Sequence, residues 1–275
     1  MSDTVQAAIL GVVQGLTEFL PVSSTAHLIL ARAFFGWDAG QFGLAFDVAC
    51  HVGTLVAVVA YFWRDLVPMP RALPLALGLV RAGPREESEW SARLIWLLVA
   101  GTIPAVVVGL LFGNVIEEHL RTVPLVAATL ALVALGMVWA ERVGQKARDE
   151  RSLTLVEALW IGCAQAAALV PGVSRSGATL VAALLVGLRR QEAARFIFLL
   201  SIPAILGAAA KEAPKIARVG LHGGGAMLAV GVASSAIVGY LAVRYFIRYV
   251  ADHSLHVFAW YRLGLAVVAV GWLVL

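Results

Sequence analysis

The sequence predicts an all-α protein that crosses a membrane several times. Hydrophobic residues make up 61% of the 275-residue chain and charged residues 14%, with a mean hydropathy of +0.88. These values are typical of a polytopic membrane protein. Apolar runs separated by charged clusters indicate helices at about residues 4–20, 24–36, 42–63, 93–113, 122–141, 153–169, 174–188, 191–210, 225–247 and 256–274. We interpret residues 1–275 as one integral membrane domain.

Two of these helices are too short to span a bilayer. At about 1.5 Å per residue, segments 24–36 and 174–188 are about 20 Å long, whereas the hydrocarbon core is about 30 Å thick. Each follows a proline, Pro21 or Pro171, that ends the preceding helix. We therefore expect two re-entrant helical hairpins, each turning back where protein or a watery cavity surrounds the turn.

The two halves of the chain, roughly 1–141 and 153–275, share short motifs in the same order. One hairpin and three spans per half give an odd number of crossings, so the second half should be inverted relative to the first. This architecture predicts a site near the membrane midplane. The recurring elements are Gly11-x-x-Gln14 with Gly162-x-x-Gln165, Pro21-x-x-Ser24 with Pro171-x-x-Ser174, Phe46 with Phe196, and the pair Gly101 and Gly109 with the pair Gly231 and Gly239.

Basic residues predict the orientation. By the positive-inside rule the side with more of them is cytoplasmic, which makes both termini external. The net charge of +4 is therefore a topology signal, and no nucleic-acid partner is expected because aromatic residues do not interleave the basic ones. The N-terminus lacks a basic region, so we expect no cleaved signal peptide. The cytoplasmic group is Arg64, Arg71, Arg81, Arg85, Arg93, Arg142, Lys146, Arg148, Arg151, Arg189, Arg190, Arg244 and Arg248, and the external group is Arg32, Arg121, Lys211, Lys215 and Arg218.

The turn of the first predicted hairpin carries an acid, a histidine and several hydroxyls. The acid lies four residues after a glutamine and therefore shares its helix face. Two serines then suit the N-cap of the next helix, which places the histidine in its first turn. The candidate site residues here are Gln14, Glu18, Ser23, Ser24, Thr25 and His27.

The turn of the second hairpin carries an arginine among glycine and hydroxyl residues. A charge near the bilayer centre costs about 2.5–3.5 kcal/mol, so this arginine implies a bound anion or a buried partner, such as a structural ion pair with Glu18. A guanidinium binds phosphate through two oxygens, and the N-termini of the two short helices add positive dipole ends. The candidates are Ser174, Arg175, Ser176 and Thr179.

Three other polar residues are weaker candidates. Asp47 and His51 lie four residues apart on the predicted third helix and could line the same cavity. Arg262 follows Tyr261, and we expect its side chain to extend to the membrane interface.

Two long motifs carry a family resemblance. Gln14-Gly15-Leu16-Thr17-Glu18-Phe19-Leu20-Pro21-Val22-Ser23-Ser24-Thr25-Ala26-His27 and Pro171-Gly172-Val173-Ser174-Arg175-Ser176-Gly177-Ala178-Thr179 resemble the undecaprenyl-diphosphate phosphatase family, also known for bacitracin resistance. The resemblance covers nearly the whole chain. It implies a multi-pass enzyme of the bacterial plasma membrane that removes the terminal phosphate of undecaprenyl diphosphate and so regenerates the lipid carrier of cell-wall synthesis. We expect its site to open to the external face.

The resemblance also implies magnesium or calcium dependence. Glu18 is the candidate metal ligand, and Gln14 stands where the family also uses glutamate, which leaves one carboxylate fewer for a hard cation.

The predicted mechanism uses residues of both turns. Arg175 and the hydroxyls of the second motif would hold the diphosphate. Ser24 is the candidate nucleophile with His27 as its base, although a water activated by His27 would use the same residues. Glu18 would orient His27 or bind the cation. The alternative function is a lipid-phosphate or anion transporter, which shares inverted repeats but needs no nucleophile and base. The sequence leaves the oligomeric state open.

Overall fold

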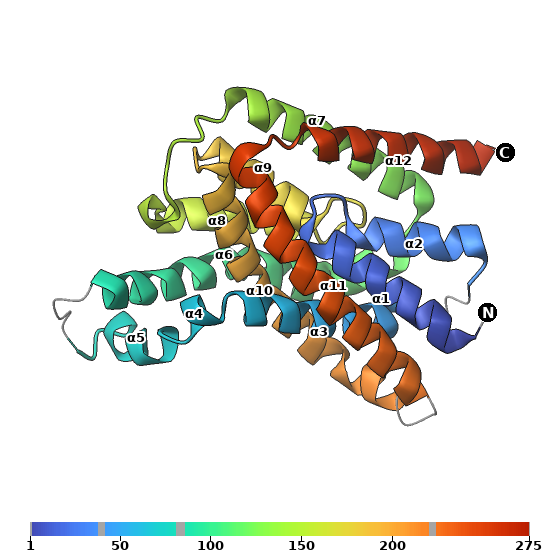
Figure 1. Cartoon of the computed structure of the whole chain (residues 1–275), viewed down its shortest axis with the longest axis horizontal. Coiled ribbons are helices and arrows are strands. Elements are labelled where there is room, and N and C mark those ends of the chain that lie inside the picture. Colours follow the sequence, from blue (N-terminus) through green and yellow to red (C-terminus); the bar gives the residue numbers. More distant parts are fainter. Residues whose placement is uncertain (1, 38–41, 81–85, 220–223, 275) are drawn as a thin grey trace.

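The computed structural model is all-helical over the residues it describes, which are 2–37, 42–80, 86–219 and 224–274 (Figure 1). The helices are α1 (Asp3–Phe19), α2 (Ser24–Phe35), α3 (Leu44–Tyr61), α4 (Trp63–Leu66), α5 (Met69–Ala76), α6 (Glu86–His119), α7 (Val123–Val143), α8 (Leu155–Ala167), α9 (Arg175–Leu185), α10 (Arg190–Val219), α11 (Gly225–Asp252) and α12 (His256–Val274), with a 3-10 turn, η1 (Glu150–Ser152), before α8.

Helices α6, α7, α10 and α11 are long and apolar enough to cross a membrane, and they are the four of this kind in the described part of the chain. Helix α3 passes the same test only together with α4 and α5, from which it is bent by 74°. These helices agree with a multi-pass protein, but the described part of the chain has four or five candidate spans where the sequence predicts six, because α12 is too short over the residues tested.

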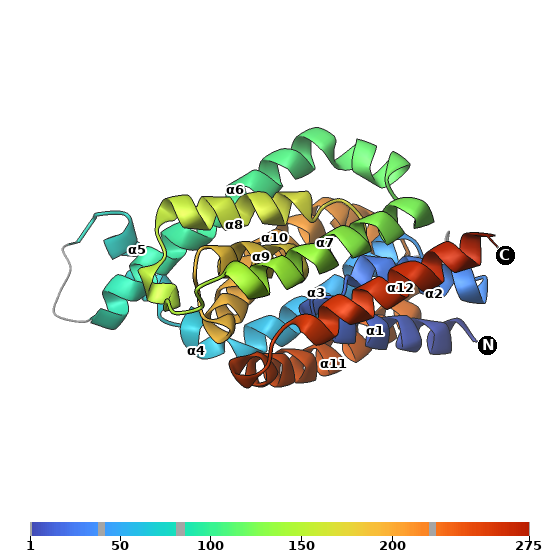
Figure 2. The same cartoon turned by 90° about the horizontal axis from the view of Figure 1, so that it is seen from above.

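Two helical hairpins meet at their turns in the middle of the molecule. The α1–α2 hairpin and the α8–α9 hairpin extend from opposite ends (Figure 2). The second turn contacts the first, because the Ser176 hydroxyl donates to the Leu20 carbonyl at 3.0 Å. The prolines therefore break the chain where the sequence predicts, and the breaks lie side by side.

Serine caps start both inner helices. Ser23 accepts from the Ala26 N–H and Ser174 accepts from the Gly177 N–H, as the sequence predicts for these positions. Their φ angles are 73° and 71°, a region that L-residues rarely adopt. Such backbone conformations persist only where surrounding contacts hold them, and they concentrate at functional sites.

Arg262 supplies contacts of this kind, and its predicted position at the interface is wrong. Its side chain is fully buried, and its N–H groups donate to the carbonyls of Pro21 at 3.2 Å, Gly172 at 2.9 Å and Val173 at 3.1 Å. It also donates to the carbonyls of Thr129 and Leu130 in α7. Because a broken helix leaves carbonyl groups without partners, one buried guanidinium satisfies both turns at once.

Glycines allow the closest helix crossings. A Cβ on Gly11 of α1 would lie 2.5 Å from the carbonyl oxygen of Gly231 in α11, and a Cβ on Gly162 of α8 would lie 2.4 Å from that of Gly101 in α6. Any larger residue would force these backbones apart. The crossings pair equivalent motif positions, since Gly11 corresponds to Gly162 and Gly101 to Gly231 in the sequence repeat.

The connection between α3 and α6 is more helical than predicted. Residues 63–76 form α4 and α5, and α6 begins at Glu86 instead of residue 93. Pro70 lies in the first turn of α5, where its missing N–H is harmless, and the Trp96 indole N–H bonds the Ala76 carbonyl at 2.8 Å. Helix α10 likewise continues to Val219, past the predicted end at residue 210.

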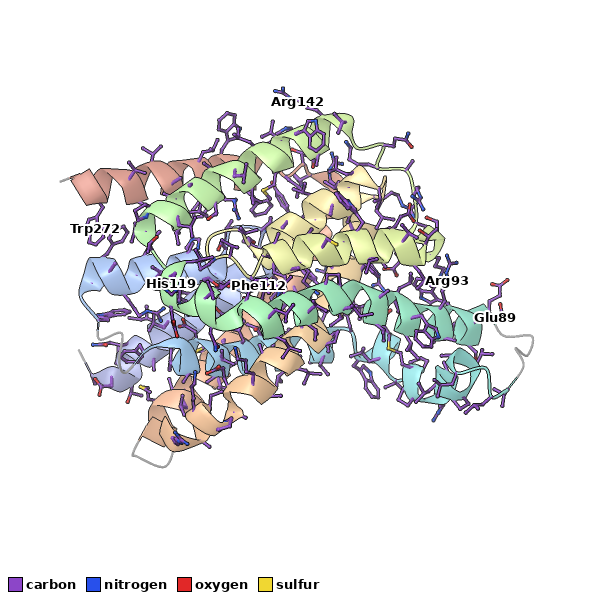
Figure 3. The ribbon with its side chains drawn as sticks, turned by 180° about the vertical axis from the view of Figure 1, so that it is seen from behind. Glu89, Arg93, Phe112, His119, Arg142 and Trp272 are labelled. Carbon is purple, nitrogen blue, oxygen red and sulfur yellow. The ribbon has the colours of Figure 1, made fainter. Side chains whose placement is uncertain are left out.

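The labelled residues mark the two ends of the molecule. Arg93 of the predicted cytoplasmic group lies with Glu89 toward one end, and His119 and Trp272 lie toward the other (Figure 3). Helix α1 begins and α12 ends at the latter end (Figures 1 and 2). The described ends of the chain are therefore on the same side, as the sequence predicts.

Candidate active site

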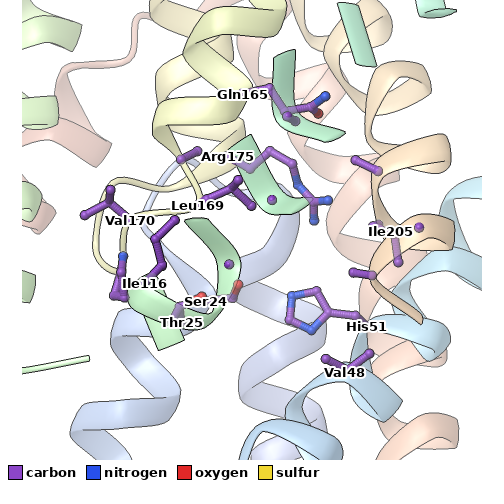
Figure 4. Close-up of a pocket in the computed structure, with 18 of the residues that line it drawn as sticks. Ser24, Thr25, Val48, His51, Ile116, Gln165, Leu169, Val170, Arg175 and Ile205 are labelled. Carbon is purple, nitrogen blue, oxygen red and sulfur yellow. The ribbon is translucent and has the colours of Figure 1, made fainter. Parts of the chain in front are cut away.

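A cavity of about 440 Å³ lies between the hairpin turns and helices α3, α6 and α10. Its polar end is formed by the turns and α3, and Ser24, His51 and Arg175 extend into it together with Gln165 (Figure 4). Its remaining wall is mostly apolar and comes from α6, α10 and the end of α8. The wall residues include Val106, Leu110, Ile116, Leu169, Val170 and Ile205.

Glu18 is the centre of the polar end. One carboxylate oxygen, Oε2, accepts from the Ser24 hydroxyl at 2.6 Å and from the Gln14 amide at 2.8 Å, while Oε1 pairs with the Arg175 guanidinium. The Glu18 side chain is 4% exposed. The predicted acid, the predicted nucleophile and the predicted phosphate ligand are therefore brought together by one side chain.

The caps explain why Ser24 and Arg175 both face Glu18. Ser23 and Ser174 are the N-caps, so Ser24 and Arg175 are the first residues of α2 and α9. The equivalence of Ser24 with Ser174 suggested by the proline spacing is thus wrong by one residue, because the stretch from Pro171 to its N-cap is one residue longer than the stretch from Pro21. The two hairpins contribute a hydroxyl and a guanidinium from matching positions.

His51 is a member of this cluster that the sequence indicated only weakly. Its Nδ1 lies 2.7 Å from the Asp47 carbonyl, and its Nε2 lies 3.3 Å from Glu18 Oε2. A carbonyl only accepts hydrogen bonds, so Nδ1 carries a proton. A favourable contact between Nε2 and a carboxylate needs a second proton, which makes the ring an imidazolium. The four-residue spacing of Asp47 and His51 on one face of α3 was the sequence signal that pointed to His51.

His27 is oriented differently from the prediction. Its Nδ1 lies 2.7 Å from the Ser23 carbonyl, and its Nε2 lies 2.7 Å from the Tyr261 hydroxyl. The carbonyl requires a proton on Nδ1, so Nε2 accepts from the phenol. His27 does not line the cavity, and its bonding partners tie α2 to α12 instead of activating Ser24.

The predicted hydroxyls separate into two groups. Ser23, Ser24, Thr25 and Ser174 line the cavity. Ser176 lies within 3.2 Å of the Ser174 hydroxyl and donates to Leu20, whereas Thr179 donates to the Arg175 carbonyl at 2.6 Å. Ser176 and Thr179 therefore stabilise the turn and the first turn of α9, and they are not cavity-lining residues.

Two buried glutamines occupy matching places in the hairpins. The side-chain oxygens of Gln14 and Gln165 have no hydrogen-bond partner within the described residues. Gln165 lines the cavity, and its amide makes only a 3.4 Å contact with the Gly101 carbonyl. The sequence indicated Gln165 only as the counterpart of Gln14 in the repeated motif.

The donor set does not fit a divalent cation. Glu18 is a single carboxylate whose two oxygens already bond Ser24, Gln14 and Arg175, whereas magnesium and calcium require several free oxygen ligands. In the described part of the chain, no group of three His, Cys, Asp or Glu side chains could hold a metal ion. Cation dependence stays a prediction of the family resemblance, and we derive no step through a metal.

Comparison with known proteins decides the family. The family model for bacitracin resistance protein BacA matches residues 7–268. The chain belongs to this family. It is 50% identical over the full length of both chains to the undecaprenyl-diphosphatase of Rubrobacter xylanophilus. It is 44% identical to that of Moorella thermoacetica, over 98% of each chain, and 46% identical to that of Thermomicrobium roseum, over 96% of this chain and 95% of the relative.

Proposed function

We propose that the protein hydrolyses undecaprenyl diphosphate to undecaprenyl phosphate and inorganic phosphate, and so recycles the lipid carrier of cell-wall synthesis. The observation that carries the proposal is the Ser24 hydroxyl, which donates to Glu18 at 2.6 Å inside a cavity that also contains Arg175. A nucleophile, a proton acceptor and a bidentate phosphate ligand are the groups that phosphoryl transfer needs. The names of the relatives support the same substrate.

In the proposed first step, Ser24 Oγ attacks the terminal phosphorus and its proton passes to Glu18. The bond between the terminal phosphorus and the bridging oxygen breaks. Glu18 then gives the proton to the departing lipid phosphate. Glu18 replaces His27 as the base in this scheme, because His27 Nε2 is already bonded to Tyr261.

In the second step, water attacks the phosphoserine. Glu18 takes a proton from the water and returns it to Ser24 Oγ as the bond between phosphorus and Oγ breaks and phosphate leaves. The alternative is direct attack by a water that Glu18 activates, with Ser24 as a phosphate ligand. Covalent label trapped on Ser24 separates the two routes, since only the first forms a phosphoenzyme.

Phosphate binding must change the partner of Arg175. The guanidinium pairs with Glu18 in this structure and has donors for a further anion. A bound diphosphate would share or replace that contact, while the N-terminal N–H groups of α2 and α9 add donors. Ser174 and Thr25 line the same space and supply hydroxyls.

We also propose that the fold is an inverted repeat with this site near the membrane midplane. The paired crossings of Gly11 with Gly231 and of Gly162 with Gly101 support it, since each packs a hairpin helix of one half on a long helix of the other. The opposite directions of the two hairpins support it as well (Figure 2). The site would open to the external face, with both termini external.

Phosphate release from detergent-solubilised protein tests the function. A transporter has no compartments to connect in detergent, so it would release no phosphate, whereas the proposed enzyme would. The matched control is Glu18→Gln, which keeps the side-chain size and removes the proton acceptor. Equal release by the wild type and Glu18→Gln would contradict the proposal.

Cysteine labelling tests the orientation. In a variant without Cys50 and Cys163, Ser152→Cys should be shielded from a membrane-impermeant thiol reagent in intact cells, and Glu118→Cys should be labelled. Both positions are exposed in the structure. The reverse pattern would place the termini in the cytoplasm.

A further inference from the structure

A second cationic group lies in the same cavity, away from Glu18. Arg121, which follows α6, and Lys211 of α10 both line the wall. Neither has a role in the proposed reaction. Arg121 is half-buried and Lys211 is exposed, so the charge that surrounds them decides whether they can bind an anion.

Arg121 is the second arginine that pairs with Asp47. Asp47 already receives two hydrogen bonds from Arg32, with Nη1 at 2.6 Å from Oδ1 and Nη2 at 3.0 Å from Oδ2. Arg121 Nη2 joins the same Oδ2 at 2.9 Å. Two arginines on one carboxylate leave a net positive charge, and Arg121 makes no other hydrogen bond to the described residues, so most of its donors stay available.

Lys211 is the second cation of this wall. It makes no ion pair with the described residues, whereas the neighbouring acid Glu212, which also lines the cavity, pairs with Lys215 at 3.1 Å. A Cβ on Gly113 of α6 would lie 3.0 Å from Lys211 Nζ, so the ammonium lies against the cavity wall near the end of α6 that precedes Arg121. Both cations therefore belong to the same end of the cavity.

The cationic group is close to the proposed active site. Asp47, which bonds Arg121, and His51, which contacts Glu18, are four residues apart on α3. Four residues correspond to about 6 Å along a helix. A phosphate that leaves Ser24, or the second phosphate of a diphosphate, could therefore reach Arg121 without crossing the apolar wall.

We propose that Arg121 and Lys211 form a second phosphate-binding subsite next to the reaction centre. The inference deepens the proposed function, because the substrate carries two phosphate groups, of which the reaction leaves one on the lipid and releases the other as inorganic phosphate. Guanidinium and ammonium groups bind phosphate oxygens through charge-assisted hydrogen bonds. The ligand is either released inorganic phosphate or the second phosphate of the lipid diphosphate.

Equilibrium binding of labelled inorganic phosphate to the detergent-solubilised full-length chain tests the free-phosphate form. Arg175→Gln removes the arginine of the reaction centre, and this variant should still bind phosphate. Adding Arg121→Gln and Lys211→Gln should weaken the remaining binding at least tenfold. Arg142→Gln, at an exposed position near the end of α7 that does not line the cavity, is the control on the Arg175→Gln background and should leave binding unchanged.

The lipid form is tested by kinetics with a short-chain polyprenyl diphosphate. The Arg121→Gln and Lys211→Gln double variant, with Arg175 intact, should raise KM at least tenfold with kcat nearly unchanged. Lys211 is exposed and Asp47 keeps Arg32, so the fold should tolerate both changes. If neither phosphate affinity nor KM changes by more than twofold, the subsite does not exist. The binding experiment gives its answer even if the wild type releases no phosphate, so the two proposals can fail separately.

Discussion

Replacing His51 by glutamine removes the imidazolium that contacts Glu18 and leaves the Ser24 hydrogen bond in place. A hydrogen bond to a charged group contributes about 1.5–3 kcal/mol, and the 3.3 Å separation of His51 Nε2 from Glu18 Oε2 places this one at the low end. Since 1.4 kcal/mol corresponds to a factor of ten, we expect kcat to fall about tenfold. The diphosphate ligands are unchanged, so KM should change by less than threefold.

The pH profile of kcat distinguishes this role from a merely structural one. The active form carries protons on both ring nitrogens, so the wild-type rate should fall as rising pH removes the proton on Nε2. His51→Gln cannot titrate and should lose that alkaline limb. The matched control is His27→Gln, which removes the other histidine near the turns and should keep the limb. Wild-type kcat together with an unchanged limb in His51→Gln would refute the reasoning.

Three further replacements have defined outcomes. Arg175→Lys keeps the charge but loses the bidentate fork, so phosphate release should drop at least tenfold; wild-type turnover by folded protein would exclude phosphate binding by Arg175. Rapid quenching with labelled terminal phosphate should trap label on Ser24, and substantial activity in Ser24→Ala without trapped label would favour direct attack by water. Burial, reinforced by Glu192 and Asp65 and opposed by Arg195, raises the pKa of Glu150 to about 7. Its folded-state pKa lies above the unfolded value, so stability is lost as pH rises from about 4.5 through 7, by up to about 3 kcal/mol. Glu150→Gln should abolish this decline in the melting temperature in detergent, and an unchanged decline would exclude Glu150 as its source.

The fold could be predicted where the length of the apolar segments and the helix-breaking prolines determine it. The apolar runs and the prolines at 21 and 171 predicted both hairpins and the long helices, although α6 and α10 extend one to three turns past the predicted ends. The sequence failed at residues 63–76, where charge and proline resemble a loop. There the Trp96 indole and packing against α6 stabilise short helices that have weak local signals. Tertiary contacts override local preference in such segments.

The sequence predicted the contacts of the site between residues that are close in the chain, but not the contacts that depend on how the helices pack. The spacing of Gln14 and Glu18 and the serines at the helix starts predicted the Gln14–Glu18 contact and the N-caps at Ser23 and Ser174. The partner of Ser24 depends on how α1, α2, α3 and α12 pack, so spacing alone favoured His27, three residues away. Packing instead directs His27 toward Tyr261 and brings His51 from α3 to Glu18.

The buried position of Arg262 follows from the backbone hydrogen bonds that the two turns need. The pattern of residues in the sequence does not show this need. Two helix breaks inside a membrane protein must leave carbonyl groups unpaired, and each such group is costly where water is absent. Hydroxyls at the turns can donate to only a few carbonyls, so a side chain with five N–H donors is a suitable partner. Arg262 donates to Pro21, Gly172 and Val173 without a carboxylate partner in the described structure. The helix breaks that form the proposed active site therefore also account for a buried arginine outside it.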